Sequence, residues 1–461
     1  MKRLALAGPF HFVGIGGAGM SPLAEILRAQ GHVVSGSDEK VSQTTQRLSA
    51  CGIRLHAGHH DPRHVEGARC LVVSSAIKDT NPELAAARQA GLRVIHRGDL
   101  LDAVMAPFPH RIAISGSHGK TTTTAMVTGI LEAAGFDPTA LVGGKLKRTD
   151  SGARIGAGGA FVAEADESDR SFLKLHPTIS LVTNVDREHL DAYKDLADVA
   201  ACFERFALGV PSTGTAILCA DDAVTAGIAV HDRARSLTYG SSEKADVRGR
   251  IEMNGGGFPT VHGTRPTGGF TFTLAVGGEM NALNALGAMA VSQALGIAPA
   301  LAGRSLSSFA GVARRLEWKG RKNGVDVWDD YGHHPTEISA TLKALRARTA
   351  GRRLVTLFQP HRVSRTRALW NEFTEAFSLS DELWLANIYA AGEPTEDGIS
   401  AELLAKAIAA KGQRVTFAGS LDQARERVLP SLRENDVFLT LGAGNVVDVG
   451  DAYLFEGGTR P

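Results

Sequence analysis

Short apolar runs alternate with helix-like stretches along the first part of the chain. The apolar runs are HFVGIG, HVVSGS, CLVVSSA and LRVIHR, and the stretches of helical character include SPLAEILRAQG and NPELAAARQAG. Strands that are spaced by helices are typical of a parallel sheet in an α/β fold. The pattern therefore predicts a doubly wound α/β domain.

The same alternation begins twice more further along. A second series contains RIAISGS, FVAEAD, ISLVTNVD and TAILCADD, then a glycine-rich, strand-like section at residues 247–279 and the helical ALNALGAMAVSQALG. A third series contains VDVWDDYGHHP, RRLVTLFQPHR, DELWLANIYAAGE and DVFLTLGAGN. A chain of 461 residues is too long for one ordinary core. We therefore predict three domains, at residues 1–105, 106–312 and 313–461.

Composition and charge favour small molecules as partners. The chain has 50 Lys and Arg against 49 Asp and Glu, a formal charge of +1. Such a balance gives no basis for binding nucleic acid or an anionic membrane surface. No apolar stretch approaches the length that spans a bilayer. We expect neither a nucleic-acid partner nor membrane insertion, and the oligomeric state stays open between monomer and homodimer.

The N-terminus and the cysteines indicate a cytoplasmic protein. The opening residues MKRLALAGPF could suggest a signal peptide, but they continue directly into a glycine-rich turn, so we interpret them as leading into a first strand. The four cysteines form no CxxC pair. Thiols without such spacing are typical of a reduced, cytosolic protein.

A phosphate-binding turn lies in ISGSHGKTTTT, residues 114–124. Gly116 and Gly119 let backbone N–H groups turn toward an anion, and the following helix adds the positive end of its dipole. Lys120 would reach the β- and γ-phosphates of a nucleotide, and the Thr121 hydroxyl would ligate Mg²⁺. The spacing is not the standard GxxxxGK[ST], since Ile114 stands where the first glycine would be. The alternative is a glycine turn that merely contains a lysine.

A second glycine-rich turn lies near the N-terminus. VGIGGAGM fits G-x-G-x-x-G through Gly14, Gly16 and Gly19, and Asp38 closes the next strand. By motif alone this is a dinucleotide fingerprint, with Asp38 placed to meet a ribose hydroxyl. The turn itself specifies only a diphosphate. A nicotinamide or flavin cofactor, another diphosphate and a simple tight turn therefore all remain open.

Acidic residues follow two apolar runs of the second series. VAEADESD contains Glu164, Asp166, Glu167 and Asp169, and TNVDREHLD contains Asp186, Glu188, His189 and Asp191. Oxygen ligands at strand ends beside a P-loop suit a nucleotide-bound Mg²⁺, and a histidine can join a second metal. Acidic loops are often merely solvated, which is the alternative.

Polar motifs also follow the strands of the third series. DDYGHHP at residues 329–335 could hold a metal or serve as a structural turn. In FQPHRVSRT, Arg362 and Arg365 are three residues apart, so on one helical turn they would form a fork for a carboxylate or phosphate. Ordinary surface arginines are the alternative reading.

The ordered set of motifs resembles the Mur ligases, from about residue 11 to residue 447. It comprises HFVGIGGAGM, SGSD, SSAI, GSHGKTTTT, EADESD, TNVDREHLDAY, RRLEWKG, DDYGHHPTEI, FQPHRVSRT, IYAAGE and GAGN. DDYGHHP and FQPHR are similar to the members that add L-alanine. Members that attach a preformed tripeptide tend to carry a DDFAHHP-like motif and lack the QPHR run.

The resemblance implies ATP-dependent ligation of L-alanine to UDP-N-acetylmuramate through an acyl phosphate. The products would be UDP-N-acetylmuramoyl-L-alanine, ADP and phosphate, in peptidoglycan precursor synthesis. It also implies an N-terminal Rossmann-like domain for the UDP-sugar, a central P-loop ATPase-type domain and a C-terminal Rossmann-like domain, with ATP and Mg²⁺ required. The two glycine-rich turns would then serve two substrates.

The resemblance also assigns residues to each ligand. The catalytic residues would be Lys120, His189 and His333. The ATP-binding residues would be Gly116, Ser117, His118, Gly119, Lys120, Thr121, Thr122, Asn284, Arg315 and Asp330. The UDP-sugar would be bound by Gly14, Gly16, Gly17, Gly19, Ser37, Asp38 and Ser75. L-alanine would be bound by Tyr331, His333, Arg362 and Arg365, and the metal by Thr121, Glu164 and His189.

Two positions depart from the family pattern. Ser117 stands where the family usually has threonine, which keeps a hydroxyl. The family's G-x-H-N-x-x-N run reads GEMNALN here, so Met280 replaces a histidine that lies near the adenine. Methionine can pack on a purine but cannot repeat the polar contact of an imidazole. Adenine recognition at Met280 is therefore left open.

Two rival functions belong to other classes. The fingerprint VGIGGAGM with Asp38 would suit a dinucleotide-dependent oxidoreductase, but that reading leaves GSHGKTT and FQPHRVSRT without a use. A nucleotide-gated binding protein without ligase chemistry is the other rival. ADP release that depends on UDP-N-acetylmuramate and on L-alanine would distinguish a ligase from these two rivals.

Overall fold

A computed structural model of the chain describes residues 6–146, 151–188, 192–231, 236–349, 351–395 and 398–455. Within these residues the strands form three sheets. The chain divides into two compact units. Unit 1 comprises Met1–Arg250, His262–Thr271 and Asn284–Leu306, and unit 2 comprises Ile251–Val261, Phe272–Leu283 and Ser307–Pro461.

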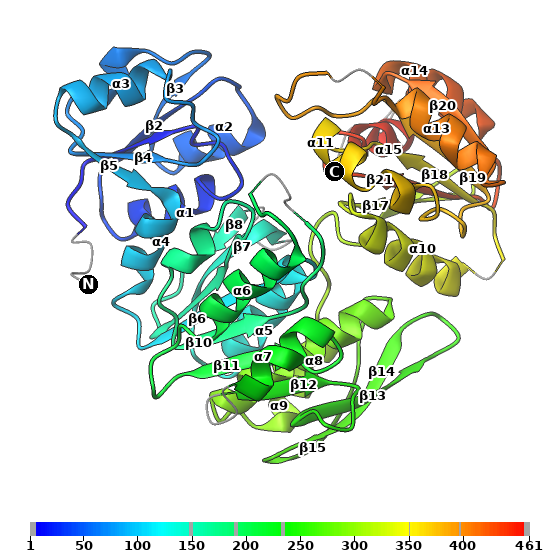
Figure 1. The fold of residues 1–461 in the computed structure, drawn as a ribbon, viewed down its shortest axis with the longest axis horizontal. Helices are drawn as coiled ribbons and strands as arrows, with labels where there is room; N and C mark the ends of the chain where they lie inside the picture. Colours follow the sequence, from blue (N-terminus) through cyan, green and yellow to red (C-terminus); the bar gives the residue numbers. More distant parts are fainter. Residues whose placement is uncertain are drawn as a thin grey trace. The chain divides into compact units, whose positions relative to one another are not determined.

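The first sheet lies in unit 1 and is drawn in blue in Figure 1. Its strand order is β3-β2-β1-β4-β5, and all neighbouring strands are parallel. Phe10 and Phe12 pack with Leu23 of α1, whereas Val13, which points the other way, packs with Leu84 of α3. Helices therefore cover both faces. The elements are β1 (Phe10–Val13), α1 (Ser21–Ala29), β2 (Val34–Asp38), α2 (Gln43–Ala50), β3 (Arg54–Ala57), η1 (Pro62–Val65), β4 (Cys70–Val73), α3 (Pro82–Gln89), β5 (Arg93–His96) and α4 (Arg97–Met105).

The second sheet has the order β15-β14-β13-β12-β11-β10-β6-β9-β7-β8. Strand β6 lies between β10 and β9 and runs parallel to both. The carboxyl ends of these three strands therefore meet at one edge, which brings the loops after them together. The strands are β6 (His110–Ser115), β7 (Thr139–Leu146), β8 (Ser151–Arg154), β9 (Ala160–Glu164), β10 (Ile179–Val182), β11 (Thr215–Cys219), β12 (Ser236–Gly240), β13 (Val247–Met253), β14 (Pro259–Arg265) and β15 (Gly268–Thr273). The helices are α5 (Lys120–Ala133), η2 (Ser171–Lys174), α6 (Leu196–Ala207), α7 (Ala223–His231), α8 (Glu279–Ala294) and α9 (Pro299–Ser307).

The third sheet lies in unit 2, with the order β16-β17-β21-β18-β19-β20. It is parallel except for the antiparallel edge strand β16. Leu354 and Leu439 pack with α10 and α13, and Val355 and Phe438 pack with α14 and α15 on the other face. The strands are β16 (Glu317–Lys322), β17 (Val325–Asp330), β18 (Leu354–Phe358), β19 (Glu382–Ala386), β20 (Val415–Gly419) and β21 (Val437–Leu441). The helices are α10 (Pro335–Thr349), α11 (Val363–Ala368), α12 (Trp370–Phe373), α13 (Ala401–Ala410), α14 (Leu421–Val428), η3 (Leu429–Ser431) and α15 (Val447–Phe455).

The predicted α/β class is confirmed by these mostly parallel sheets with helices between their strands. Each sheet falls within one of the three predicted segments, although the exact domain limits at residues 105 and 312 stay a prediction. Within the described residues, every helix is too short or too polar to cross a bilayer.

Candidate active site

The predicted phosphate-binding turn lies between β6 and a helix, as the sequence predicts. Strand β6 ends at Ser115 and α5 begins at Lys120. Gly116 and Gly119 between them have φ values of 134° and 83°, which side chains other than glycine rarely adopt. A Cβ at Gly116 would also collide with the Thr183 hydroxyl. Both glycines are therefore required by the backbone of this turn.

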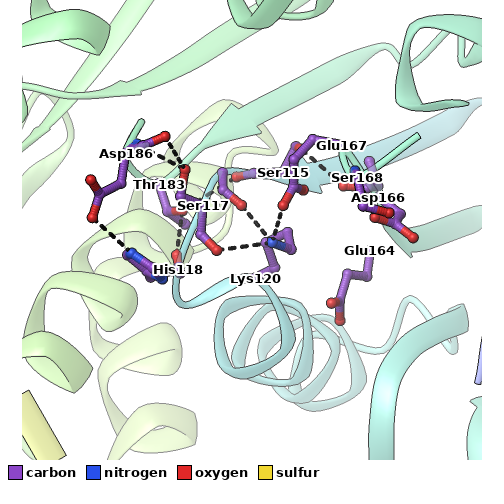
Figure 2. A network of polar contacts seen from close by, with 12 residues as sticks. Ser115, Ser117, His118, Lys120, Glu164, Asp166, Glu167, Ser168, Thr183 and Asp186 are labelled. Atoms are coloured by element: carbon purple, nitrogen blue, oxygen red, sulfur yellow. Dashed lines mark hydrogen bonds and ion pairs between the residues drawn. The ribbon is translucent and has the colours of Figure 1, made fainter. Parts of the chain in front are cut away.

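The loop after β10 supports the turn from one side (Figure 2). The amide of Ser117 donates to the carbonyl of Asn184 at 2.9 Å, and the amide of His118 donates to the Asn184 side chain at 2.9 Å. Thr183 donates its hydroxyl to the His118 carbonyl at 2.6 Å, and a ring nitrogen of His118 lies 3.1 Å from Asp186. The TNVD motif thus holds the turn in its left-handed geometry.

Lys120 is held by its own turn and by one carboxylate. Its Nζ donates to the carbonyls of Gly116 and Ser117 at 2.6 and 3.0 Å, and to Glu167 Oε1 at 2.7 Å. Figure 2 shows the ammonium group between Ser117 and Glu167. Burial alone would lower the pKa of Lys120, but the charges of Glu167, Glu188 and Glu164 outweigh it and raise that pKa. The lysine therefore stays protonated at the turn.

Thr121 and Glu164 form the oxygen-rich part of the site. The Thr121 hydroxyl donates to Glu164 Oε1 at 3.1 Å, and the Gly143 amide donates to Glu164 Oε2 at 2.6 Å. A Cβ at Gly143 would overlap that carboxylate. A hydroxyl beside a carboxylate is a donor set that suits Mg²⁺. The third predicted ligand, His189, lies outside the described residues, so its role stays a prediction.

The remaining predicted nucleotide residues of unit 1 line the same turn. Thr122 follows Thr121 in the first turn of α5 and is buried. The side-chain amide of Asn284 lies against Gly119, close enough that a Cβ on this glycine would overlap it. Met280 lies in the first turn of α8, within unit 2. The role of Met280 at the adenine stays open.

The first glycine-rich turn is closed by Asp38 at the end of β2. Asp38 Oδ2 accepts the amide of Gly16 at 2.9 Å, and Gly14 has a φ of 71°. The amide of Gly17 bonds back to the Gly14 carbonyl at 3.1 Å. Asp38 therefore shapes the turn directly in this structure. Its predicted contact with a ribose stays a prediction.

Ser37 faces the interior rather than the turn's open side. Its side chain is fully buried and donates to Glu83 Oε2 at 2.6 Å. Glu83 also contacts His11 at 3.2 Å and His64 at 2.8 Å. Burial would raise the pKa of Glu83, but the bonds from His11, Ser37 and His64 lower it to about 2. Ser37 thus supports the turn through Glu83, and its direct contact with a substrate stays a prediction.

Ser75 is linked to the acidic loop after β9. Its hydroxyl donates to Asp169, and His96 lies 3.0 Å from the Ser75 oxygen. Arg97 donates from Nη2 to Asp166 at 2.8 Å and to Asp169 at 2.9 Å. Residues of the first sheet's domain therefore contact the same loop that carries Glu167, within unit 1.

In unit 2, Asp330 ends strand β17 and is buried. It accepts the amides of Leu316 at 2.6 Å and Gly332 at 2.7 Å. Burial raises the pKa of Asp330 to about 6, although Arg315 and both amides oppose the shift. The neighbouring Asp329 pairs with Arg314 at 2.9 Å.

Tyr331 and His333 lie together after β17. Their ring centroids are 5.6 Å apart, and the guanidinium of Arg315 lies 5.1 Å from the Tyr331 ring. His333 donates from Nδ1 to the Tyr331 carbonyl at 3.1 Å, which in the neutral ring leaves the lone pair on Nε2. Its ring also lies 5.9 Å from that of His361. The residues predicted to bind L-alanine from the first motif are thus brought together.

Arg362 and Arg365 flank the start of α11. Arg362 precedes the helix with a φ of 70°, so it does not share a helical turn with Arg365, contrary to the premise from spacing. Arg365 donates to the His361 carbonyl at 3.2 Å, and Arg362 lies 3.8 Å from Glu393. Burial, His333 and both arginines lower the pKa of His361 to about 3. The alanine clamp itself stays a prediction.

Several residues of the site make contacts that the sequence did not assign to them. They are Glu167, Glu83, Arg97, His361 and Glu393. Glu167 was one of four acidic candidates in EADESD, and His361 and Glu393 stand in the motifs FQPHRVSRT and IYAAGE, but these motifs specify no contact for any of the three. Glu83 and Arg97 act across long sequence separations, which no local pattern reveals.

Family models match the chain in three consecutive parts. The model described as the Mur ligase family catalytic domain matches residues 9–109, the Mur ligase middle domain matches residues 114–292, and the Mur ligase glutamate ligase domain matches residues 314–444. These ranges contain both glycine-rich turns and the third sheet.

Among similar proteins, the UDP-N-acetylmuramate--L-alanine ligase of Desulfosudis oleivorans is 46% identical over 448 residues, covering 96% of this chain and 97% of that protein. The enzyme of the same name from Myxococcus xanthus is 44% identical, covering 97% and 95%. A solved structure of the UDP-N-acetylmuramate-alanine ligase of Thermotoga maritima has a TM-score of 0.83 at 25% identity, covering 97% of this chain and 98% of that one. A murein peptide ligase from Psychrobacter arcticus has a TM-score of 0.73 at 25% identity, covering 96% and 98%. The chain therefore belongs to the Mur ligase family.

Proposed function

We propose that the protein ligates L-alanine to UDP-N-acetylmuramate with ATP, giving UDP-N-acetylmuramoyl-L-alanine, ADP and phosphate. The reaction would supply a peptidoglycan precursor. Relatives at 44–46% identity over nearly their whole length carry the name of this activity. The observation in the structure that carries the proposal is the P-loop lysine beside the Thr121–Glu164 pair.

The first chemical step makes the carboxylate reactive. A lactyl carboxylate oxygen attacks the γ-phosphorus of ATP, its bond to phosphorus forms, and the bond to the ADP oxygen breaks. Charge accumulates on the γ-phosphoryl oxygens in that transition state. Lys120, protonated and fixed by its turn, would neutralise this charge with little rearrangement.

The donor set of Thr121 and Glu164 would hold Mg²⁺, with His189 as the predicted additional ligand. When bound, the ion supplies charge neutralisation at the phosphoryl oxygens. The protein's own contribution is to fix this pair. The Gly143 amide and the position of Thr121 at the start of α5 orient both oxygens.

The second step forms the amide. The neutral amine of L-alanine attacks the carbonyl carbon of the acyl phosphate, and the tetrahedral intermediate releases phosphate. Arg362 and Arg365 are our candidates for binding the alanine carboxylate, since arginine forms paired hydrogen bonds with carboxylates. His333 is a candidate acceptor for the proton that the amine loses, with a purely positioning role as the alternative.

Three rival activities differ from this proposal in the cofactor, the product or the acceptor. A dinucleotide-dependent oxidoreductase would change nicotinamide absorbance, and a nucleotide-gated binding protein would bind ATP without forming an amide. A murein peptide ligase would accept a preformed tripeptide. Relatives named for ligation of L-alanine favour L-alanine over the tripeptide, since one of them is 46% identical over 96% of this chain.

Phosphate release with each acceptor tests the proposal. The purified chain with Mg²⁺, ATP and UDP-N-acetylmuramate should release phosphate only when L-alanine is added, and omission of any one reactant should abolish release. L-serine, glycine and the tripeptide are the comparison acceptors. Phosphate release that depends on the tripeptide, or that proceeds without the UDP-sugar, would overturn the proposal. Cytoplasmic location and oligomeric state stay predictions that this assay leaves aside.

A further inference from the structure

Arg97 occupies a position between two motifs of unit 1. It is the first residue of α4, directly after strand β5, and its side chain is 17% exposed. Its Nη2 atom donates to both Asp166 and Asp169, at 2.8 and 2.9 Å. Two carboxylates on one nitrogen fix the plane of the guanidinium. They therefore determine where the other N–H groups point.

The other end of the guanidinium faces the first glycine-rich turn. Arg97 Nη1 lies 3.1 Å from the position that a Cβ on Gly19 would take. A guanidinium carries five N–H donors, and the two on Nη2 are used by the aspartates. Among the residues that the structure describes, Nε and Nη1 of Arg97 have no acceptor. Three donors beside the turn are thus available to a ligand.

The turn itself presents further donors to the same place. Within the described ranges, the amides of Ala18 and Gly19 donate to no protein group, whereas those of Gly16 and Gly17 are already used. A narrow cavity is lined by Gly19, Arg97, Leu141, Glu164 and Asp166, among others. Arg97 is the one cationic side chain among its lining residues in this described region. Backbone amides and a guanidinium form the usual environment of a phosphate.

We propose that Arg97 binds the diphosphate of the UDP-sugar through Nη1, while Asp166 and Asp169 orient its guanidinium. The identity of the ligand rests on the proposed function. Burial would lower the pKa of Arg97, but Asp166 and Asp169 raise it, so the side chain enters the site as a cation.

The position of Arg97 also connects the two phosphate-binding turns. Asp166 and Asp169 flank Glu167, which holds Lys120 at the P-loop. The loop of residues 166–169 therefore contacts both Arg97, beside the first glycine-rich turn, and Lys120 of the second turn. Substitution of Arg97 would leave the backbone amides of the first turn unchanged. The contribution of Arg97 to ligand binding can therefore be measured separately from that of the amides.

Titrations of the full chain with UDP and with uridine test the proposal. Loss of a charged hydrogen bond to phosphate should weaken UDP binding about 10- to 100-fold in Arg97→Ala and leave uridine binding within about 3-fold. Arg97→Lys should lie between, because lysine keeps the charge but lacks the second donor of the fork. Arg88→Ala is the matched control, since the Arg88 side chain lies in the same domain on α3, is exposed and pairs with Asp79. It should bind UDP as the unmodified chain does.

Two outcomes would overturn the assignment. Unchanged UDP affinity in both Arg97 variants would mean that the guanidinium does not contact the diphosphate. An equal loss for uridine and UDP would mean that Arg97 only maintains the fold. If Arg97→Ala does not fold by circular dichroism, the same comparison is decided by Arg97→Lys. Binding requires no turnover, so a chain that binds UDP through Arg97 without ligating L-alanine would contradict only the proposed function.

Discussion

The ammonium group of Lys120 lies 2.7 Å from Oε1 of Glu167. Both side chains are largely buried, with exposed fractions of 16% and 3%. Glu167 is itself held through its carbonyl, which accepts the Tyr193 hydroxyl at 2.6 Å. Nucleotide binding would replace this carboxylate by phosphate oxygens as the partner of the lysine. We therefore infer that Glu167 neutralises Lys120 while no nucleotide is bound.

Glu167→Gln should destabilise the nucleotide-free protein more than the nucleotide-bound one. Breaking a buried ion pair leaves a charge without its partner, and we expect a loss of about 2–4 kcal/mol, since Glu164 and Glu188 still neutralise Lys120 in part. Saturating ATP should recover part of this loss because phosphates supply the missing charge. Denaturant unfolding with and without ATP measures both values. Glu66→Gln, an exposed residue of unit 1, is the control, and an identical deficit with and without ATP would reject this role.

Gly116→Ala should distort the P-loop. Its φ of 134° strains any side chain, and the new Cβ would meet the Thr183 hydroxyl, so we expect a cost of at least about 1–3 kcal/mol in stability and weaker ATP binding. The matched control is Gly129→Ala, within α5, where the nearest atom to a Cβ is Ser305 Oγ at 3.6 Å. Alanine there should be neutral or stabilising by up to about 1 kcal/mol. Equal effects of the two substitutions on ATP affinity would argue against the requirement at Gly116.

The stability of unit 2 should depend on the protonation of Asp330. Burial raises its folded pKa to about 6, so its contribution is fully present below the unfolded pKa and is lost as pH rises through about 6. Relative to Asp330→Asn, the unmodified chain should lose about 2–2.5 kcal/mol between pH 4 and pH 8, because a shift of roughly two units corresponds to about 2.7 kcal/mol and a small part is already lost at pH 4. Urea unfolding of both proteins across this range measures the difference. A difference that is constant with pH would show that Asp330 titrates normally.

Arg365→Ala should raise the KM for L-alanine far more than the KM for ATP. A charged hydrogen bond to a carboxylate contributes about 1.5–3 kcal/mol, which corresponds to roughly a 10- to 100-fold change in KM. Arg367→Ala, two residues along the same helix and exposed, is the control. Steady-state kinetics with each substrate varied in turn gives the two constants. Parallel increases for alanine and ATP would remove Arg365 from the alanine site.

Much of the site could be predicted because its signals are local. Gly116, Gly119, Lys120 and Thr121 occur at fixed spacing between an apolar run and a helix, so a local pattern predicts the turn, although the loop after β10 also supports it. The acidic loops could be placed as well, because strands β9 and β10 are parallel neighbours of β6.

The residue pattern alone could not divide the roles among the acidic residues, and only the family resemblance pairs Glu164 with Thr121. Glu164 and Glu167 stand three residues apart in one run, yet Glu164 meets Thr121 and Gly143 while Glu167 meets Lys120. That difference arises from the turn after β9, and no pattern of residue types encodes its path. The contact of Arg97 with Asp169 spans 72 residues and depends on how the first domain packs within unit 1.

Some local elements were also invisible in the pattern. Strand β3, RLHA, is an edge strand with partly exposed side chains, so it lacks the apolar run that marks its neighbours. Arg362 was expected on a helical turn, but the chain enters α11 through a left-handed residue at that position. Spacing predicts a shared helical face only when both residues lie inside the helix.

Transfer of a heavy oxygen isotope tests most directly whether ATP activates the sugar-borne carboxylate. UDP-N-acetylmuramate labelled in its lactyl carboxylate is incubated with the purified chain, Mg²⁺, ATP and L-alanine, and the phosphate released is examined by mass spectrometry. An acyl phosphate passes one carboxylate oxygen to phosphorus, so labelled phosphate should appear in step with amide formation. Amide formed with unlabelled phosphate, or ATP consumed with no amide at all, would refute activation by phosphorylation.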